Sequence, residues 1–386
     1  MHTPWFSEAA FASRFKRLKQ QKAWRQPHGF ADNSHFINFS GHDYLGLSQH
    51  GAVKAAAQKV IQENGVGSTG SALVCGHSHY HAALEQELAA FLHQPKALLF
   101  HSGYSANLAV LGTLLLGQGA IFLDRLSHAS LIEGALHSGV YFRRFQHKKV
   151  AQLSQWLGQH KGKPIMVATD GVFSMDGDEA PLRELAKLCQ QQGALLYVDD
   201  AHGFGVLGPQ GKGTAAKAGV PTSQLPLTMV TLSKALGVAG AAVVGKAHLI
   251  DALIQYAKPY IYTTARPPAM AAAGLATLNV MQEEPWRQEK VLALAQYFRQ
   301  EAHHMGYTVA PSNTPIQPLI LGSNEAALSL SYWLRDSGMW AVAIRPPTVP
   351  EGSARVRISF SALHKKADVR RLLAALYDYS KAHWRL

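Results

Sequence analysis

The stretches PIMVATD (164–170), PLRELAKLCQQQ (181–192) and LLYVDD (195–200) follow one another closely and decide the fold. The first and the third are apolar almost throughout, which is typical of parallel strands that are covered on both faces. The second places its leucines at helical spacing, so it is predicted to be the helix that connects the two strands. Strand, helix and strand in this order predict a parallel sheet that binds ligands at the carboxyl ends of its strands.

The same alternation of short apolar runs and helical runs continues on both sides of this unit. The runs predicted as strands are KALLF (96–100), AIFLD (120–124), YFRRF (141–145), LTMVTLS (227–233) and AAVVG (241–245), and those predicted as helices are 52–63, 80–92, SANLAVLGTLL (105–115) and ASLIEGAL (129–136). Apolar strands separated by helices predict a doubly wound α/β core with helices on both faces.

The two ends of the chain have different patterns. Residues 1 to about 30 place apolar and basic residues at helical spacing and are predicted to form an amphipathic helix, followed by a short strand at 36–39. Residues 268–298 are rich in Ala and Leu and are predicted to be helical. From residue 306 to the end, the pattern is strand, helix, strand, strand, helix, which predicts an α+β unit.

These patterns divide the chain into three parts. A chain of 386 residues exceeds the length at which a single hydrophobic core usually stops growing. We predict an N-terminal helix and strand segment (1–45), a large α/β domain (46–270) and a smaller C-terminal α+β domain (271–386).

Composition limits the location and the partners of the protein. Cys75 and Cys189, the two cysteines, cannot form a disulfide framework and match no metal-ligand spacing, so we expect a cytoplasmic protein without a bound metal. We recognise no secretion signal and no membrane span. The net charge of +12 suits phosphate-rich small molecules, an acidic carrier protein or nucleic acid, and equally a plain solvated surface. Because the basic residues lack interleaved aromatic side chains, we expect no nucleic acid and no membrane as partner.

Two strand ends carry the side chains with chemical potential. Asp199 and Asp200 end the strand at 195–200 and His202 follows it, at the edge where α/β folds place their functional groups. Lys234 follows the strand at 227–233 among small and apolar residues, where burial lowers the pKa of an amine and favours Schiff-base chemistry. A structural interpretation, with Asp200 capping the next turn, accounts for one of these residues but not for the set.

A lysine paired with an acidic residue is the arrangement that pyridoxal phosphate (PLP) requires. The lysine forms the Schiff base, and a carboxylate such as Asp199 keeps the pyridine nitrogen protonated so that the ring accepts electrons. The phosphate needs backbone N–H groups and hydroxyls at a helix N-terminus, which Ser102-Gly103-Tyr104-Ser105-Ala106-Asn107 offers between a predicted strand and a predicted helix.

Eight motifs in a fixed order now make the chain recognisable. They are HDYLGL (42–47), GSTGSALVCGHSHYHAALE (67–85), HSGYSAN (101–107), DRLSHASL (124–131), DGVFSMDGD (170–178), VDDAHGFG (198–205), TLSKALG (231–237) and RPPTVPEGSARVRIS (345–359). From about residue 15 to its end, the chain resembles the α-oxoamine synthases. That resemblance implies the aminotransferase type I fold of PLP enzymes, with a mostly parallel seven-stranded sheet and a smaller α+β C-terminal domain.

The resemblance also assigns the catalytic and cofactor residues. It implies that Lys234 is the Schiff-base lysine and the base that removes the α-proton of the amino acid, that Asp199 pairs with the pyridinium nitrogen, that His202 hydrogen-bonds the phenolic oxygen and that His128 stacks on the ring. Further cofactor contacts are implied for Ser174 near the ring oxygen, and for Gly103, Tyr104, Thr231 and Ser233 around the phosphate. Because these enzymes are homodimers with sites at the subunit interface, Thr263 or Thr264 of the partner is expected to complete the phosphate site.

Substrate contacts follow in the same way. Arg357 resembles the arginine that binds the amino-acid carboxylate, for which a bidentate guanidinium is suited. Arg25 and Thr348 resemble contacts to the acyl substrate, although Arg25 also fits a surface helix. Two positions depart from the family pattern: His42 stands where Asn is common and Asp170 where Glu is common. Neither departure touches the lysine or the pyridinium partner, but both can alter substrate positioning and with it acyl recognition.

Within the family, the stretches at 124–131 and 345–359 are most similar to members that join L-alanine to a pimeloyl thioester, carried on coenzyme A or acyl carrier protein, in biotin biosynthesis. Glycine C-acetyltransferase or another α-oxoamine synthase is the alternative. A nucleotide-binding Rossmann protein is a rival from another class, because of the glycine-rich loop at 65–71. That loop follows a predicted helix rather than a strand, so the dinucleotide fingerprint lacks its context.

Overall fold

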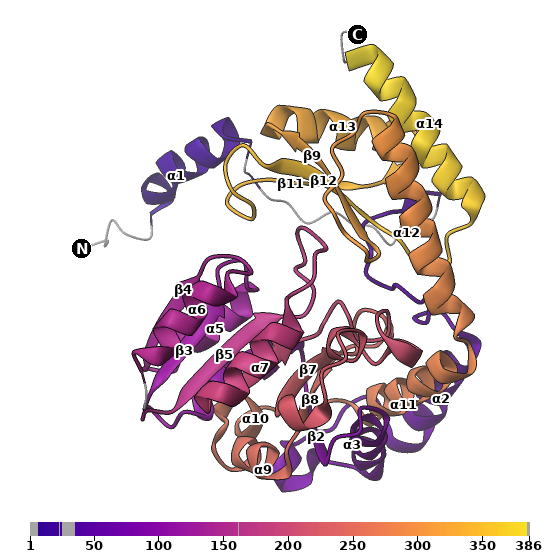
Figure 1. Ribbon diagram of the computed structural model, residues 1–386. Helices are drawn as coiled ribbons and strands as arrows, with labels where there is room; N and C mark the ends of the chain where they lie inside the picture. The colour runs from indigo at the N-terminus through magenta and orange to yellow at the C-terminus, as the bar shows by residue number, and fades with distance from the viewer. Residues whose placement is uncertain (1–6, 23, 25–34, 161, 384–386) are drawn as a thin grey trace.

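A seven-stranded sheet forms the larger part of the molecule (Figure 1). The computed structural model describes residues 7–22, 24, 35–160 and 162–383. The strand order is β2-β8-β7-β6-β5-β3-β4, in which only β8 is antiparallel to its neighbours. The strands are β2 (Lys96–Phe100), β3 (Ala120–Asp124), β4 (Tyr141–Phe145), β5 (Ile165–Asp170), β6 (Leu195–Asp199), β7 (Leu227–Thr231) and β8 (Ala241–Gly245). The predicted mostly parallel sheet is confirmed.

Helices cover both faces of this sheet, which is why its strands are apolar throughout. Along β3, Ile121 and Leu123 pack into one hydrophobic cluster while Ala120 and Phe122 pack into another. The helical elements of this part are α2 (Gly51–Asn64), the π-helical turn η2 (Ala72–Gly76), α3 (His79–Phe91), α4 (Gly103–Thr113), α5 (Ala129–His137), α6 (Val150–Gly158), α7 (Leu182–Gln192), η3 (Pro209–Gly211), α8 (Thr214–Lys217), η4 (Thr222–Gln224), α9 (Ala247–Tyr256), α10 (Lys258–Ile261) and α11 (Pro268–Glu283). The glycine-rich loop lies between α2 and η2, so the strand that a dinucleotide fingerprint requires does not precede it.

The C-terminal strands form a second, smaller layer to one side of the sheet (Figure 1). Its antiparallel sheet has the order β11-β12-β9, and a separate parallel pair joins β1 to β10. The elements are β1 (Ile37–Asn38), α12 (Trp286–His304), β9 (Ile316–Gly322), α13 (Asn324–Asp336), β10 (Met339–Trp340), β11 (Val342–Ile344), β12 (Ala354–Ser359) and α14 (Lys366–His383). The expected α+β pattern is present, with its middle strand divided into β10 and β11.

Two predicted helices differ from the observed ones. Helix α1 (Glu8–Gln20) ends well before residue 30, because Lys22 adopts a left-handed backbone conformation with φ of 52° that does not continue a helix; Pro27 lies outside the described residues. The helical stretch at 268–298 is two helices, α11 and α12, since Pro285 has no backbone N–H to continue the helix.

Other features bear on location and partners. No helix in the described parts of the chain has both the length and the apolar character needed to cross a membrane. Among the same residues, no group of three or more His, Cys, Asp and Glu side chains is arranged to hold a metal ion. Cys189 is buried, whereas Cys75 is exposed.

Candidate active site

A cavity of about 180 Å³ opens at the carboxyl ends of β6 and β7. Eight of the residues singled out in the sequence line it, namely Gly103, Tyr104, His128, Asp199, His202, Thr231, Ser233 and Lys234. They come from segments up to 131 residues apart, and parallel strands bring them together because their carboxyl ends share one edge of the sheet.

Lys234 lies in the turn after β7 and reaches into this cavity. Its Nζ is 2.8 Å from Nε2 of His202. Burial lowers the pKa of Lys234 to about 8, although the carboxylates of Asp199 and Asp170 oppose this shift. The amine is therefore neutral in part of the molecules near pH 7, as a nucleophile or a base must be.

Asp199 ends β6 and is held on both carboxylate oxygens. Oδ2 accepts a hydrogen bond from Nδ2 of Asn107 at 2.7 Å, and Oδ1 accepts one from the backbone N–H of Ala201 at 3.0 Å. Tyr197 donates its hydroxyl to Oδ1 of Asn107 at 2.7 Å, which fixes the orientation of that amide. Donors on both oxygens fix the orientation of the carboxylate.

His128 stands beside Asp199 through a short network. Nδ2 of Asn107 also donates to Oγ of Ser130 at 2.8 Å, and Oγ of Ser130 is 2.7 Å from Nδ1 of His128. Since Ser130 accepts from Asn107, its own proton is free to point at Nδ1, which leaves the ring proton of His128 on Nε2. Asn107 thus links the residue predicted to pair with the cofactor nitrogen to the residue predicted to stack on its ring.

Asp170 is a carboxylate that the sequence analysis treated as a minor departure. It accepts a hydrogen bond from the backbone N–H of His128 at 3.0 Å, and it lies opposite Asp199 in the register of β5 and β6. Burial and the charge of Asp199 raise the pKa of Asp170 well above its usual value. This departure from the family pattern therefore bears on the charge around Asp199 and Lys234 as well as on substrate positioning.

Hydroxyl and backbone groups gather where the phosphate was predicted. Ser102 caps α4 by accepting from the N–H of Ser105 at 3.1 Å, which leaves Gly103 in the first turn with its N-terminal dipole toward the cavity. A Cβ on Gly103 would come within 2.9 Å of the terminal methyl group of Met229, so a larger residue there would require that side chain to move. Across the cavity, Oγ1 of Thr231 and Oγ of Ser233 lie 2.8 Å apart.

Arg357 of β12 closes the site from the C-terminal side. Its Nη2 lies 2.9 Å from Nε2 of His42, and its Nη1 donates to the backbone oxygen of Ser174 at 3.2 Å. Burial, together with the charges of Arg357 and Lys234, lowers the pKa of His42 to about 3. His42 is therefore a neutral acceptor that orients the guanidinium, so its departure from the family pattern concerns the amino-acid side of the site.

Five predicted residues are not among those that line the cavity: Arg357, described above, and Ser174, Thr264, Thr348 and Arg25. Ser174 meets Arg357 through its backbone, and Thr264 forms an isolated bridge with Ser71. Thr348 is exposed, with its N–H bonded to the oxygen of Arg345. Arg25 lies outside the described residues.

The sequence analysis missed Tyr44 and Ser130, and it placed Asn107 only in the predicted phosphate site, not beside Asp199. The hydroxyl of Tyr44 is 2.7 Å from Nδ1 of His202, and Asn107 and Ser130 form the network beside Asp199. Each stands inside a quoted motif, so their position in HDYLGL, HSGYSAN and DRLSHASL was the available signal.

Comparison with known proteins agrees with this geometry. The model of the family "Aminotransferase class I and II" matches residues 34–376. The chain is 47% identical to the 8-amino-7-oxononanoate synthase of Marinobacter nauticus, over 95% of each chain, and 48% identical to that of Alcanivorax borkumensis, over 96% of each. A serine palmitoyltransferase solved with PLP superimposes with a TM-score of 0.89 at 28% identity, over 97% of each chain.

The chain belongs to the α-oxoamine synthases, within the class I and II aminotransferase family. The predicted family, fold and cofactor are confirmed. α-Oxoamine synthases depend on PLP, and the donor set here fits that cofactor: a buried amine of lowered pKa, a carboxylate fixed by donors, an imidazole ring and a helix N-terminus with adjacent hydroxyls.

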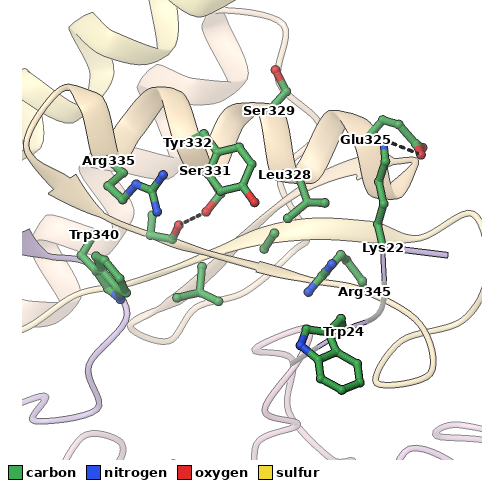
Figure 2. A pocket seen from close by; sticks show the side chains of 13 residues that line it. Lys22, Trp24, Glu325, Leu328, Ser329, Ser331, Tyr332, Arg335, Trp340 and Arg345 are labelled. Atoms are coloured by element: carbon green, nitrogen blue, oxygen red, sulfur yellow. Dashed lines mark hydrogen bonds and ion pairs between the residues drawn. The ribbon is translucent and has the colours of Figure 1, made fainter. Parts of the chain in front are cut away.

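A second and larger cavity of this α-oxoamine synthase, about 600 Å³, lies between α13, the edge strand β11 and the residues after α1 (Figure 2). Its lining includes three cations, Lys22, Arg335 and Arg345, and three aromatic side chains, Trp24, Tyr332 and Trp340. Lys22 pairs with Glu325 at 3.1 Å, and the guanidinium of Arg335 lies over the ring of Tyr332. This cavity is named the basic pocket below. One of its lining residues, Arg345, lies three positions before Thr348 in the sequence.

Proposed function

We propose that this PLP-dependent C-acyltransferase condenses L-alanine with a pimeloyl thioester. The products are 8-amino-7-oxononanoate, carbon dioxide and the free thiol, and the reaction is a step of biotin biosynthesis. The observation that carries the proposal is 47–48% sequence identity to 8-amino-7-oxononanoate synthases over almost the whole chain. In this chain, Lys234 and Asp199 line the same cavity.

Lys234 is the group we assign to proton transfer at the α-carbon of alanine. Its amine is buried and its pKa is lowered to about 8, so it takes a proton near neutral pH and returns it later in the cycle. PLP, when bound, draws electrons from that carbon into its ring and so stabilises the negative charge that attacks the thioester. Asp199 favours this by holding a negative charge at the inner wall of the cavity.

Arg357 is the group we assign to the alanine carboxylate. His42 and the oxygen of Ser174 hold two of its nitrogens, which fixes the plane of the guanidinium before substrate arrives. A planar guanidinium offers two parallel N–H donors to a carboxylate. The α-carbon is thereby directed to one position relative to Lys234.

We propose that Arg25 and Thr348 contact the acyl donor, and that the donor enters from the side of the basic pocket. Trp24 and Arg345 line that pocket. In the sequence, Trp24 directly precedes Arg25, and Arg345 lies three positions before Thr348. Coenzyme A and acyl carrier protein are both anionic, and the cations of the pocket attract either carrier. Both remain donors to test.

We also propose that two copies form a homodimer around the site, with Thr264 of the partner completing the phosphate contacts. Large apolar side chains cluster next to Thr264: Val74 is 81% and Tyr262 is 79% exposed, and Val66 and Leu73 are exposed as well. The bridge from Ser71 to Thr264 holds these two segments together. An exposed apolar cluster of this kind marks a protein interface. A cytoplasmic location agrees with two cysteines that form no disulfide.

The test supplies L-alanine, glycine and L-serine separately, each with pimeloyl, acetyl and palmitoyl thioesters of coenzyme A and with pimeloyl acyl carrier protein. Product mass, thiol release and loss of label from carboxyl-labelled amino acid are measured together. We expect 8-amino-7-oxononanoate from alanine and a pimeloyl donor only. Preferred use of glycine with acetyl-CoA would assign the chain to glycine C-acetyltransferase activity, and no turnover with any pair would overturn the proposal.

A further inference from the structure

His202 lies within hydrogen-bond distance of two side chains from separate segments, Tyr44 and Lys234. Tyr44 lies between β1 and α2 and is fully buried, with its hydroxyl oxygen 2.7 Å from Nδ1 of His202. The other ring nitrogen of His202, Nε2, is 2.8 Å from Nζ of Lys234. Tyr44 therefore contacts the side of the imidazole that faces away from the lysine.

The number of protons shared by Tyr44 and His202 follows from their surroundings. Burial, and the nearby positive charges led by Lys234, hold the pKa of His202 well below its usual value, so the imidazole is neutral and carries one ring proton. The other titratable groups acting on it, His42, Arg357 and His128, all oppose a positive imidazole. Burial raises the pKa of Tyr44, so the phenol keeps its proton.

Only one placement of the phenol proton of Tyr44 and the ring proton of His202 gives both protons an acceptor. If Nδ1 carried the ring proton, it would donate to the oxygen of Tyr44, and the buried phenol proton would need another acceptor, which the described part of the chain does not offer it. If Nε2 carries the ring proton, Tyr44 donates to Nδ1 and both protons are used. The second arrangement turns an N–H donor toward the cavity.

We propose that Tyr44 is a positioning residue that holds His202 in the tautomer with its proton on Nε2, so that the ring donates to the phenolic oxygen of PLP. The proposal rests on the placement of PLP in this cavity but not on the identity of the amino acid or the acyl donor. An ammonium form of Lys234 would donate to the same Nε2 and oppose this tautomer. The effect of Tyr44 is therefore greatest when the lysine nitrogen carries no such charge.

The first test is Tyr44→Phe, which removes the hydroxyl and keeps the ring. A donor to the phenolic oxygen stabilises its negative form, so weakening that donor should raise the midpoint of the pH titration of the visible PLP band by about one pH unit. The matched control is Tyr307→Phe, a buried tyrosine of the C-terminal part whose hydroxyl donates to the oxygen of Leu376 at 2.8 Å. We expect its titration to match the wild type. A Tyr44→Phe protein that binds PLP with an unchanged midpoint would overturn the proposal.

The second test needs no cofactor and no activity. Nitrogen-15 spectra of histidine-labelled, PLP-free protein are recorded above pH 9, where Lys234 is neutral, and His202 is identified by the signals that His202→Gln lacks. We expect an unprotonated Nδ1 in the wild type and a mixture of tautomers in Tyr44→Phe. A protonated Nδ1 in the wild type would overturn the proposal even if Tyr44→Phe failed to fold.

Discussion

The cavity around Asp199 and the basic pocket differ in how deeply their charged side chains are buried. Asp199 is 4% exposed and has a donor on each oxygen, and the buried Lys234, which lines the same cavity, has a lowered pKa. In the basic pocket, Lys22 and Glu325 form an ion pair whose side chains are half exposed or more. Buried charges respond strongly to the loss of a partner, whereas exposed pairs contribute about 0–1 kcal/mol. The proposed chemistry thus depends on buried groups, whereas the attraction of the donor that we propose for the basic pocket depends on exposed charges.

The largest effect is expected at the centre of the buried part. Lys234→Ala removes the amine that moves the α-proton, and we expect turnover to fall by about a thousandfold or more, measured as product per minute with alanine and pimeloyl-CoA. Lys246→Ala, at an exposed lysine, is the control and should retain full activity. Substantial turnover in Lys234→Ala would remove the lysine from the chemistry.

Asp199→Asn keeps the shape of the side chain and removes its charge. Without the negative charge the ring nitrogen loses its proton more readily and PLP becomes a weaker electron acceptor, so we expect kcat/KM to fall about a hundredfold. The exposed Asp251→Asn serves as the comparison. An equal response of the two variants would show that burial of Asp199 has no bearing on catalysis.

Arg357→Lys tests the arginine that His42 and the oxygen of Ser174 hold in place. A lysine supplies the charge but not two parallel donors, and His42 has no guanidinium to orient, so we expect KM for alanine to rise about twentyfold with a smaller change in kcat. KM for the thioester should be unaffected. A change confined to the thioester would move Arg357 to the acyl side.

The pKa of Lys234 predicts how PLP uptake depends on pH. Because burial lowers this pKa from 10.5 to about 8, the reactive neutral amine increases as pH rises through 8 and then levels off. From pH 7 to 9, uptake by PLP-free protein should accelerate about tenfold, followed as growth of the visible band. A small primary amine measured in parallel corrects for the ionisation of PLP itself. A midpoint near 10.5 would mean that the lysine is not desolvated.

The smallest effect is expected in the basic pocket. Reversing two cations, Arg335→Glu with Arg345→Glu, should raise KM for the pimeloyl donor only about threefold at low salt, and the difference should shrink as salt is added, because exposed charges are screened. Comparing pimeloyl-CoA with pimeloyl acyl carrier protein shows which carrier depends on these arginines. An unchanged KM with both donors would show that the basic pocket does not bind the acyl donor.

The strands were predictable because their signal is local. β3, β5, β6 and β7 are continuous apolar runs, and each was predicted within two residues. The helix ends were harder, since the ends of α1 and α11 depend on the backbone at Lys22 and Pro285 rather than on the apolar pattern. The division at residues 45 and 270 remains a prediction; α11, beyond residue 270 for most of its length, packs on α2 and α3.

The sequence by itself determined the sheet, the family and the eight cavity residues, because apolar periodicity and ordered motifs are properties of the chain alone. Only the tertiary structure decided what surrounds them. The contacts of Asn107 with Asp199, of His42 with Arg357 and of Tyr44 with His202 join residues 92, 315 and 158 positions apart. Such contacts fix tautomers and charge states through distance and burial, and neither quantity exists until the chain has folded.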